Sequence, residues 1–173
     1  VAKVVIARRT RPVQKVVFMG MGEPAHNLDA VMEAIALLGR EGGIGHKHLV
    51  LSTVGDLRLF DRLAILGAGD VRPALALSLH TMQDARRVEL LPRAPRIPVN
   101  TLIERADAYA RASGYPLQIQ WTLLAGVNDG PDEVEALVAG LQGRYAVLNM
   151  IPYNEVDGMV HRRPTPERCT ELF

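Results

Sequence analysis

Cysteine is almost absent from this chain, because Cys169 is the only one in 173 residues. A single cysteine excludes a disulfide within the chain, and it excludes a zinc or iron–sulfur site built from the cysteines of this chain alone. An excess of charge of one sign is also absent, since 20 lysines and arginines stand against 19 acidic residues and leave a net charge of +1. The overall charge therefore argues neither for nor against nucleic acid as a partner, and any basic surface must be local.

Long apolar runs are missing as well. No stretch approaches the roughly 18 consecutive apolar residues of a membrane span, and residues 1–9 (VAKVVIARR) lack a signal-peptide cleavage pattern. We therefore expect a cytoplasmic protein without a membrane partner. With 48 % hydrophobic and 23 % charged residues, residues 1–173 have the composition of one soluble globular domain. The chain starts at Val1 and stops inside a helix that begins at Thr165, so we expect this domain to be truncated at both ends.

Apolar runs of strand length alternate with segments of helical period along the whole chain. The expected strands are residues 16–20, 48–52, 72–79, 117–124 and 147–151. The expected helices are residues 28–39, 57–66, 100–113 and 132–141, with Gly39, Gly67 and Gly114 marking three of their ends. Nearly continuous hydrophobicity within the strands is typical of parallel strands covered by helices. The alternation predicts an α/β fold, either a barrel or a doubly wound sheet, and the pattern alone does not decide between the two.

Polar residues and glycines stand at the carboxyl ends of all five expected strands. These ends are residues 20–24 (GMGEP), 52–55 (STVG), 78–80 (SLH), 124–130 (LAGVNDG) and 151–154 (IPYN). In both kinds of α/β fold, ligands bind at the carboxyl ends of the parallel strands. One polar strand end can be a simple turn, but five of them indicate a shared pocket.

Each candidate group also has a plainer structural role. Glu23, with neighbouring backbone carbonyls, can receive the ammonium group of an amino-acid-like ligand, or it can be a solvated turn residue. Hydroxyls at Ser52 and Thr53 can bind a carboxylate or a ribose, although such residues more often complete a turn or cap a helix. His80 suits acid–base chemistry but more often makes structural hydrogen bonds. Asn154 can read the edge of an adenine or a ribose through its amide.

Together these segments resemble motifs of radical S-adenosylmethionine (SAM) enzymes, and most closely those of the RlmN/Cfr family of rRNA adenine carbon-2 methyltransferases. The motifs are residues 20–24 (GMGEP), 51–55 (LSTVG), 76–80 (ALSLH), 127–130 (VNDG), 149–154 (NMIPYN) and 162–165 (RRPT). The resemblance implies a partial (β/α)6 radical SAM barrel with parallel strands and outer helices. It assigns a supporting role to the 127–130 loop. It also implies that SAM is bound by Gly22, Glu23, Ser52, Ser78, Leu79, His80 and Asn154.

The same resemblance implies a reaction and its cofactors. The substrate would be carbon 2 of an adenine in 23S rRNA, with tRNA as a further substrate, and an electron donor such as flavodoxin would be needed. A [4Fe–4S] cluster would be held by a Cys-x-x-x-Cys-x-x-Cys loop, which this chain does not contain. We therefore expect no catalytic residue and no metal ligand in this chain. Cys169 occupies an apolar helix position, and we interpret it as a packing residue rather than as the family's methyl-carrying cysteine.

Two other hypotheses remain at the sequence level. The chain could belong to a divergent radical SAM enzyme with a substrate other than RNA, or to a degenerate, cluster-free barrel that serves as a SAM-binding or interaction module. The sequence departs from the family pattern at His26, at residues 120–121 (QW) and at residues 92–98 (PRAPRIP). These departures affect the expected substrate more than the expected binding of SAM.

One local stretch is basic. It contains Arg86, Arg87, Arg93 and Arg96, which can contact RNA phosphates or form an ordinary solvated surface. Trp121 can stack a base, but we expect it in the core.

Overall fold

The computed structural model describes residues 2–172. Its elements in chain order are α1 (Ala2–Arg8), β1 (Val16–Phe18), the 3-10 helix η1 (Pro24–Asn27), α2 (Leu28–Arg40), the 3-10 helix η2 (His46–His48), β2 (Leu49–Thr53), α3 (Leu57–Ala64), β3 (Ala74–Ser78), α4 (Asp84–Leu90), α5 (Val99–Ser113), β4 (Leu117–Leu123), α6 (Pro131–Leu141), β5 (Ala146–Pro152) and α7 (Pro166–Leu172). None of the helices in this range combines the length and the apolar composition needed to cross a membrane.

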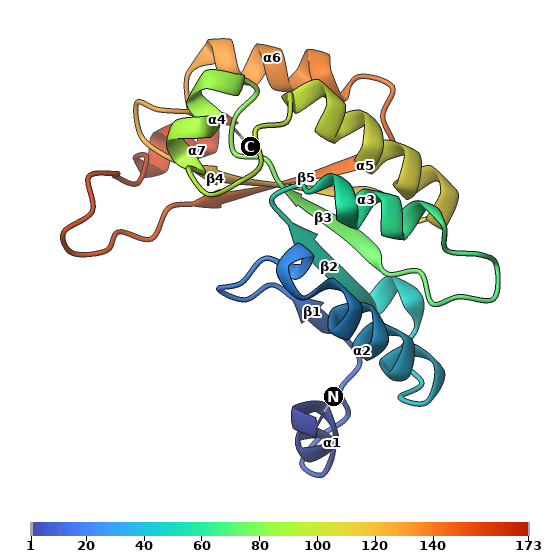
Figure 1. The fold of residues 1–173 in the computed structure, drawn as a ribbon. Coiled ribbons are helices and arrows are strands. Elements are labelled where there is room, and N and C mark those ends of the chain that lie inside the picture. The colour runs from blue at the N-terminus through green and yellow to red at the C-terminus, as the bar shows by residue number, and fades with distance from the viewer. Residues whose placement is uncertain (1, 173) are drawn as a thin grey trace.

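The five strands form one parallel sheet in the order β1-β2-β3-β4-β5. A doubly wound sheet reverses its strand order at a switch point, and this sheet does not. The connections between parallel strands are right-handed. When the strands lie in sequential order, such connections place all the connecting helices on the same face of the sheet, as in a barrel. Figure 1 shows α2, α3, α5 and α6 along one side of the twisted sheet. The topology therefore settles the choice that the sequence pattern left open, in favour of an open, barrel-type arrangement.

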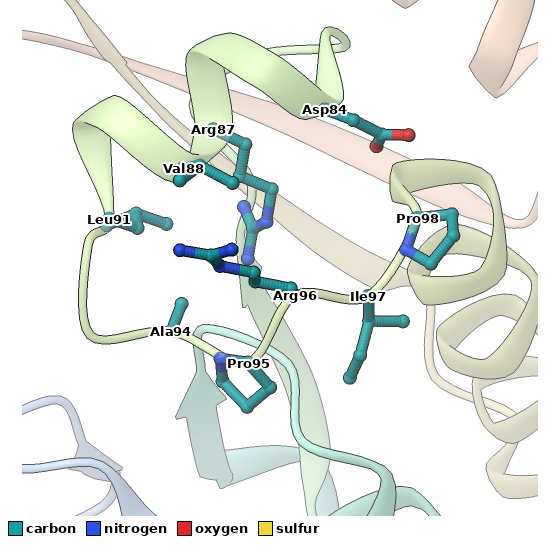
Figure 2. Close-up of a pocket in the computed structure, with 9 residues that line it drawn as sticks. All are labelled: Asp84, Arg87, Val88, Leu91, Ala94, Pro95, Arg96, Ile97 and Pro98. Atoms are coloured by element: carbon teal, nitrogen blue, oxygen red, sulfur yellow. The ribbon is translucent and has the colours of Figure 1, made fainter.

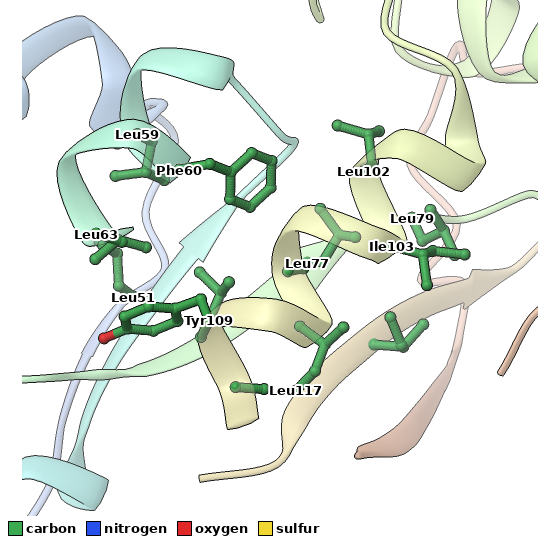
Figure 3. Close-up of a cluster of buried hydrophobic side chains, with 14 of the residues drawn as sticks. Leu51, Leu59, Phe60, Leu63, Leu77, Leu79, Leu102, Ile103, Tyr109 and Leu117 are labelled. Carbon is green, nitrogen blue, oxygen red and sulfur yellow. The ribbon is translucent and has the colours of Figure 1, made fainter. Parts of the chain in front are cut away.

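The main core lies between this face of the sheet and the helices. Alternate strand residues point into it, for example Leu51 of β2 and Leu77 of β3, because successive side chains in a strand face opposite sides. Figure 3 shows both leucines in one cluster with Phe60 of α3 and Leu102 of α5. Trp121 of β4 is buried in the same core, as predicted.

The opposite face of the sheet carries smaller and more polar side chains. Val50, Ala74 and Ala76 form a separate small apolar cluster there. Strand register then places Ser78 beside Gln120, and Gln120 beside Asn149. The Asn149 amide Nδ2 donates to the Gln120 Oε1 at 2.7 Å. On this face Val50 and Ala76 are buried, whereas Ser52 and Ser78 remain partly exposed towards the carboxyl ends of their strands.

The two outer strands leave the edges of the sheet unpaired within residues 2–172. β1 has only three residues, whereas β5 has seven and exposes Val147, Leu148 and Ile151. Cys169 of α7 is half-buried and packs against the main core, as the sequence predicted.

All five expected strands are confirmed, with ends that differ by a few residues. The predicted helix over residues 28–39 is confirmed as α2, which ends one residue later at Arg40, so that Gly39 lies within its last turn. A Cβ at Gly39 would lie 2.6 Å from the Val71 Cγ1, so the glycine makes room for a packed side chain rather than ending the helix. Gly114 does end α5, in the left-handed conformation with φ 81°. The short helix α4 was not predicted.

Gly55, which follows β2, is required by both conformation and packing. Its φ is 97°, and an added Cβ would lie 2.5 Å from the Leu102 Cδ2. Gly55→Ala should lower the free energy of unfolding by about 2–5 kcal/mol, combining left-handed strain of about 1–2 kcal/mol with an overpacking cost of about 1–3 kcal/mol. Gly43→Ala is the matched control, because Gly43 also has positive φ but a Cβ there meets nothing within 4 Å. If urea denaturation shows the same loss of unfolding free energy for Gly55→Ala and Gly43→Ala, the contact with Leu102 carries no cost.

Candidate functional site

A small cavity opens where β1, β2 and β3 end. Its volume is about 90 Å³, and it is lined by Phe18, Met19, Gly20, Gly22, Glu23, Ser52, Thr53, Val54 and Ser78. Four of the seven residues predicted to bind SAM are therefore brought together here. They come from three segments that are at least 26 residues apart in the chain, and the parallel register of the three strands places them at one edge.

The two glycines in the cavity wall are not required by the folded chain itself. Neither Gly20 nor Gly22 has a positive φ, and a Cβ on either would meet no atom within 4 Å. Glycine at these positions leaves the backbone bare towards the cavity, which lets a small molecule approach the carbonyl and N–H groups closely.

The hydroxyls of Ser52 and Ser78 face the same space. Ser52 pairs with Ala76 in the β2–β3 register, and both serines alternate with core leucines, so their side chains lie on the face of the sheet opposite the main core. Within residues 2–172 neither hydroxyl has a hydrogen-bond partner, and both residues remain partly exposed. Two hydroxyl groups are thus free to bind a ligand.

Hydrogen bonds from neighbouring residues hold the Glu23 carboxylate in place beside the cavity. Its Oε1 accepts a hydrogen bond from the Thr53 hydroxyl at 2.6 Å, and its Oε2 accepts one from the Val54 N–H at 2.9 Å. The same carboxylate caps η1 by accepting from the Ala25 N–H. The carboxylate therefore joins the end of β1 to the end of β2, and its negative charge stays beside the cavity.

The end of β3 is held by a second carboxylate in the same way. Glu133 of α6 is fully buried, and it accepts hydrogen bonds from the Thr81 hydroxyl at 2.5 Å and from the Met82 N–H at 2.9 Å. Arg86 forms an ion pair with this carboxylate. Arg86 is therefore neither an available phosphate contact nor an ordinary solvated residue, because its charge is paired with a buried carboxylate.

Arg87 is the functional-site residue that sequence reasoning misread. It is 4 % exposed, and its guanidinium donates to the carbonyl oxygens of Ser78 at 3.0 Å and Leu79 at 2.6 Å, and to that of Val54. Burial lowers the pKa of Arg87 to about 10. Figure 2 shows its side chain reaching from α4 towards the strand ends. It joins the ends of β2 and β3 and is not a surface contact for RNA; nothing in the sequence distinguished it from Arg86.

Leu79 and His80 lie beside the cavity without lining it. The Leu79 side chain is fully buried in the main core, which leaves only its backbone near the strand end. His80 has a positive φ of 64°, and its Nδ1 accepts a hydrogen bond from the Thr122 N–H at 2.9 Å. Asn128, buried in the loop after β4, donates to the His80 carbonyl at 2.7 Å, which confirms the supporting role predicted for that loop.

Asn154 follows β5 and is exposed. It does not line the cavity at β1–β3. Within the described residues, no group of three or more His, Cys, Asp or Glu side chains could hold a metal ion.

Comparison with known sequences finds proteins named probable RNA methyltransferase. The chain is 64 % identical over 172 residues to one from Leptothrix cholodnii and 61 % identical over 172 residues to one from Methylibium petroleiphilum. These alignments cover 99 % of this chain but 49 % and 48 % of the two relatives. The chain thus spans about half the length of the curated relatives it matches. No family model matches the sequence.

Comparison with solved structures confirms the α/β fold of parallel strands with outer helices. A radical SAM methyltransferase from Sphaerobacter thermophilus aligns with a TM-score of 0.87 and 32 % identity, over 99 % of this chain and 50 % of that one. A domain of pyruvate-formate lyase-activating enzyme from Bacteroides vulgatus aligns with a TM-score of 0.69 over 92 % of this chain and 91 % of that one. Its 17 % identity makes this second likeness one of fold alone.

The buried position of His80 predicts a pH dependence of stability. Burial, with a smaller contribution from the charge of Arg87, lowers the pKa of His80 from 6.5 to about 4. Above pH 6.5 both the folded and the unfolded protein carry this imidazole neutral. As pH falls from 6.5 towards 4 only the unfolded state takes up the proton, so the free energy of unfolding should fall by up to about 1.4 kcal/mol per pH unit.

Urea denaturation across this pH range, compared with His80→Asn, measures the effect. Asparagine tolerates positive φ and does not titrate, so the variant should lose this part of the pH dependence. If the unfolding free energies of the wild-type protein and His80→Asn changed in parallel with pH, His80 would not be the source of the pH dependence.

Proposed function

We propose that this chain is the SAM-binding part of a radical SAM methyltransferase that methylates carbon 2 of an adenine in 23S rRNA, with tRNA as a further candidate substrate. The observation that carries the proposal is the cavity at the ends of β1–β3, where two bare glycines and two unpartnered serine hydroxyls meet. The similarity to proteins named RNA methyltransferase and to a radical SAM methyltransferase supports the class of reaction. The RlmN/Cfr motifs in the sequence support the adenine carbon-2 position.

The residues at the cavity fit the polar end of SAM. In the proposal, the hydroxyls of Ser52 and Ser78 donate to its carboxylate or ribose, and the backbone around Gly22 receives its ammonium group. Glu23 holds the two strand ends in place and keeps a negative charge beside that ammonium. Leu79, His80 and Asn154 complete the proposed set, with Leu79 acting through its backbone and Asn154 approaching from the end of β5.

A [4Fe–4S] cluster would supply the electron that cleaves SAM, and its cysteine ligands would come from chain outside residues 1–173. Since Cys169 is the only cysteine here and packs against the core, none of this chain's residues is assigned to the cluster. Cytoplasmic location and a flavodoxin-type electron donor belong to the same proposal.

SAM binding is tested with the full-length protein after anaerobic reconstitution of its cluster. Ser52→Ala and Ser78→Ala should each weaken SAM binding by roughly 2- to 10-fold in calorimetric titration, because each removes a hydrogen bond worth about 0.5–1.5 kcal/mol. Ser113→Ala is the matched control, since that serine bonds the Ala110 carbonyl at the end of α5. Unchanged affinity in both site variants would refute the SAM site.

The reaction is tested by incubating the same protein with a 23S rRNA transcript, SAM and reductant, followed by nucleoside mass spectrometry. We expect 2-methyladenosine to form. SAM cleavage without RNA methylation would favour a divergent radical SAM enzyme. The departures from the family pattern at Gln120 and at residues 92–98 point to this alternative. SAM binding without cleavage would favour a degenerate binding module.

A further inference from the structure

The loop between α4 and α5 separates two further cavities close to the proposed SAM site. The larger has a volume of about 240 Å³ and is lined by Glu23, His26, Val54, Leu90, Leu91, Pro92, Arg93, Ala94 and Pro95. The smaller, of about 140 Å³, lies on the other side of Leu91, Ala94 and Pro95 and is lined also by Arg87 and Arg96 (Figure 2). Glu23 and Val54 line both the larger cavity and the proposed SAM cavity, so the two adjoin.

This loop is held in one shape by its own hydrogen bonds. The Asp84 carboxylate accepts from the Val99 N–H at 2.7 Å and closes the segment at its base. The Leu91 N–H donates to the Arg87 carbonyl at 2.8 Å, and two tight turns follow before α5. Three prolines within residues 92–98 restrict the backbone further. Binding to such a loop loses little conformational entropy, since the loop is already ordered.

Two arginines on this loop have charges that the protein does not use. Arg93 and Arg96 are exposed, and neither has a hydrogen-bond or ion-pair partner among residues 2–172. The nearest acids in the cavity walls are committed elsewhere: Glu23 binds Thr53 and Val54, and Asp84 binds Val99. Arg86 and Arg87 serve internal contacts, so only the other two of the four arginines remain available to a ligand.

We infer that this loop, which we call the 91–98 loop, binds one unstacked nucleotide of an RNA substrate next to the SAM site. The base would enter the larger cavity, whose walls are mostly leucine, proline, alanine and valine. The flanking phosphates would meet the guanidinium groups of Arg93 and Arg96, which match phosphate oxygens in pairs. This combination of an apolar slot and free arginines fits single-stranded RNA, whose bases can leave the stack. The inference rests on the proposed RNA methylation and adds where the RNA lies.

The size of the larger cavity limits what it can hold. Its volume of about 240 Å³ falls below the ~300–1,000 Å³ of pockets for drug-sized ligands, so it admits a group of about one nucleobase. A duplex or a protein helix would contact only the rim of the loop.

The experiment measures binding of a fluorescein-labelled single-stranded RNA, taken from the methylated region, to the full-length protein by anisotropy over a range of salt concentrations. Arg93→Ala/Arg96→Ala should weaken binding by about tenfold or more. The slope of log K against log salt should become flatter by about 1.4, because each phosphate contact on a single strand contributes about 0.7. SAM affinity, measured in the same protein, should stay unchanged.

The control variant is Arg40→Ala/Arg105→Ala, which removes the same charge from exposed ion pairs on α2 and α5. It should leave RNA binding and its salt slope unchanged. Ala94→Leu, which narrows both cavities without altering charge, should weaken binding while keeping the wild-type slope.

An unchanged affinity and slope in Arg93→Ala/Arg96→Ala would overturn the inference, even if the wild-type protein methylates RNA. An equal loss of RNA affinity in the Arg40→Ala/Arg105→Ala control would also overturn the inference. Polyglutamate that competes as strongly as unlabelled RNA would overturn it as well, because this result would indicate an acidic protein partner. Failure of the wild-type protein to methylate RNA, with the oligonucleotide still bound through Arg93 and Arg96, would instead count against the proposed function alone.

Discussion

The site depends on two carboxylates that fasten the ends of the central strands. Glu23 holds Thr53 and Val54 at the end of β2, and Glu133 holds Thr81 and Met82 after β3. In both places a threonine hydroxyl donates to one carboxylate oxygen while the next N–H donates to the other. Hydrogen bonds to charged groups contribute about 1.5–3 kcal/mol each, so strand ends held in this way resist fraying. Ser52 and Ser78 keep their positions because the residues that follow them are fixed.

Arg87 completes this framework from a third direction. Carboxyl ends of parallel strands present carbonyl oxygens that a helix or a neighbouring strand does not always satisfy. A buried guanidinium that donates to the carbonyls of Ser78, Leu79 and Val54 satisfies three of them at once. Arg87 thereby anchors the base of the 91–98 loop to the strand ends that line the proposed SAM cavity. Burial, and to a smaller extent the positive charge of Arg87, lowers the pKa of His80.

Much of the fold could be predicted from the sequence, because the information lay in local patterns. Apolar runs such as residues 74–77 mark buried parallel strands wherever they occur, and all five were found. The strand order could not be predicted, since a barrel and a doubly wound sheet share the same local alternation. The packing role of Gly39 could not be predicted either, because it depends on Val71, which is distant in sequence.

Some residues of the candidate site could likewise be predicted from local patterns, and others could not. Motifs at strand ends identified Gly22, Glu23, Ser52 and Ser78, and topology brought these four to one cavity. Arg86 and Arg87 read as solvent-facing charges, because their partners Glu133 and the strand-end carbonyls lie far along the chain or in the backbone. Contacts with Glu133 and with backbone carbonyls, which the local sequence pattern does not specify, decided which arginines are internal and which remain free.

The unpaired edge of β5 has a consequence for handling this polypeptide alone. Seven residues of open backbone beside exposed Val147, Leu148 and Ile151 form a template on which another extended chain can add. In a larger protein a neighbouring segment can occupy that template and extend the sheet. In isolation the edge invites self-association, so turbidity and oligomerisation of residues 1–173 would report on an unshielded strand rather than on a poorly folded domain.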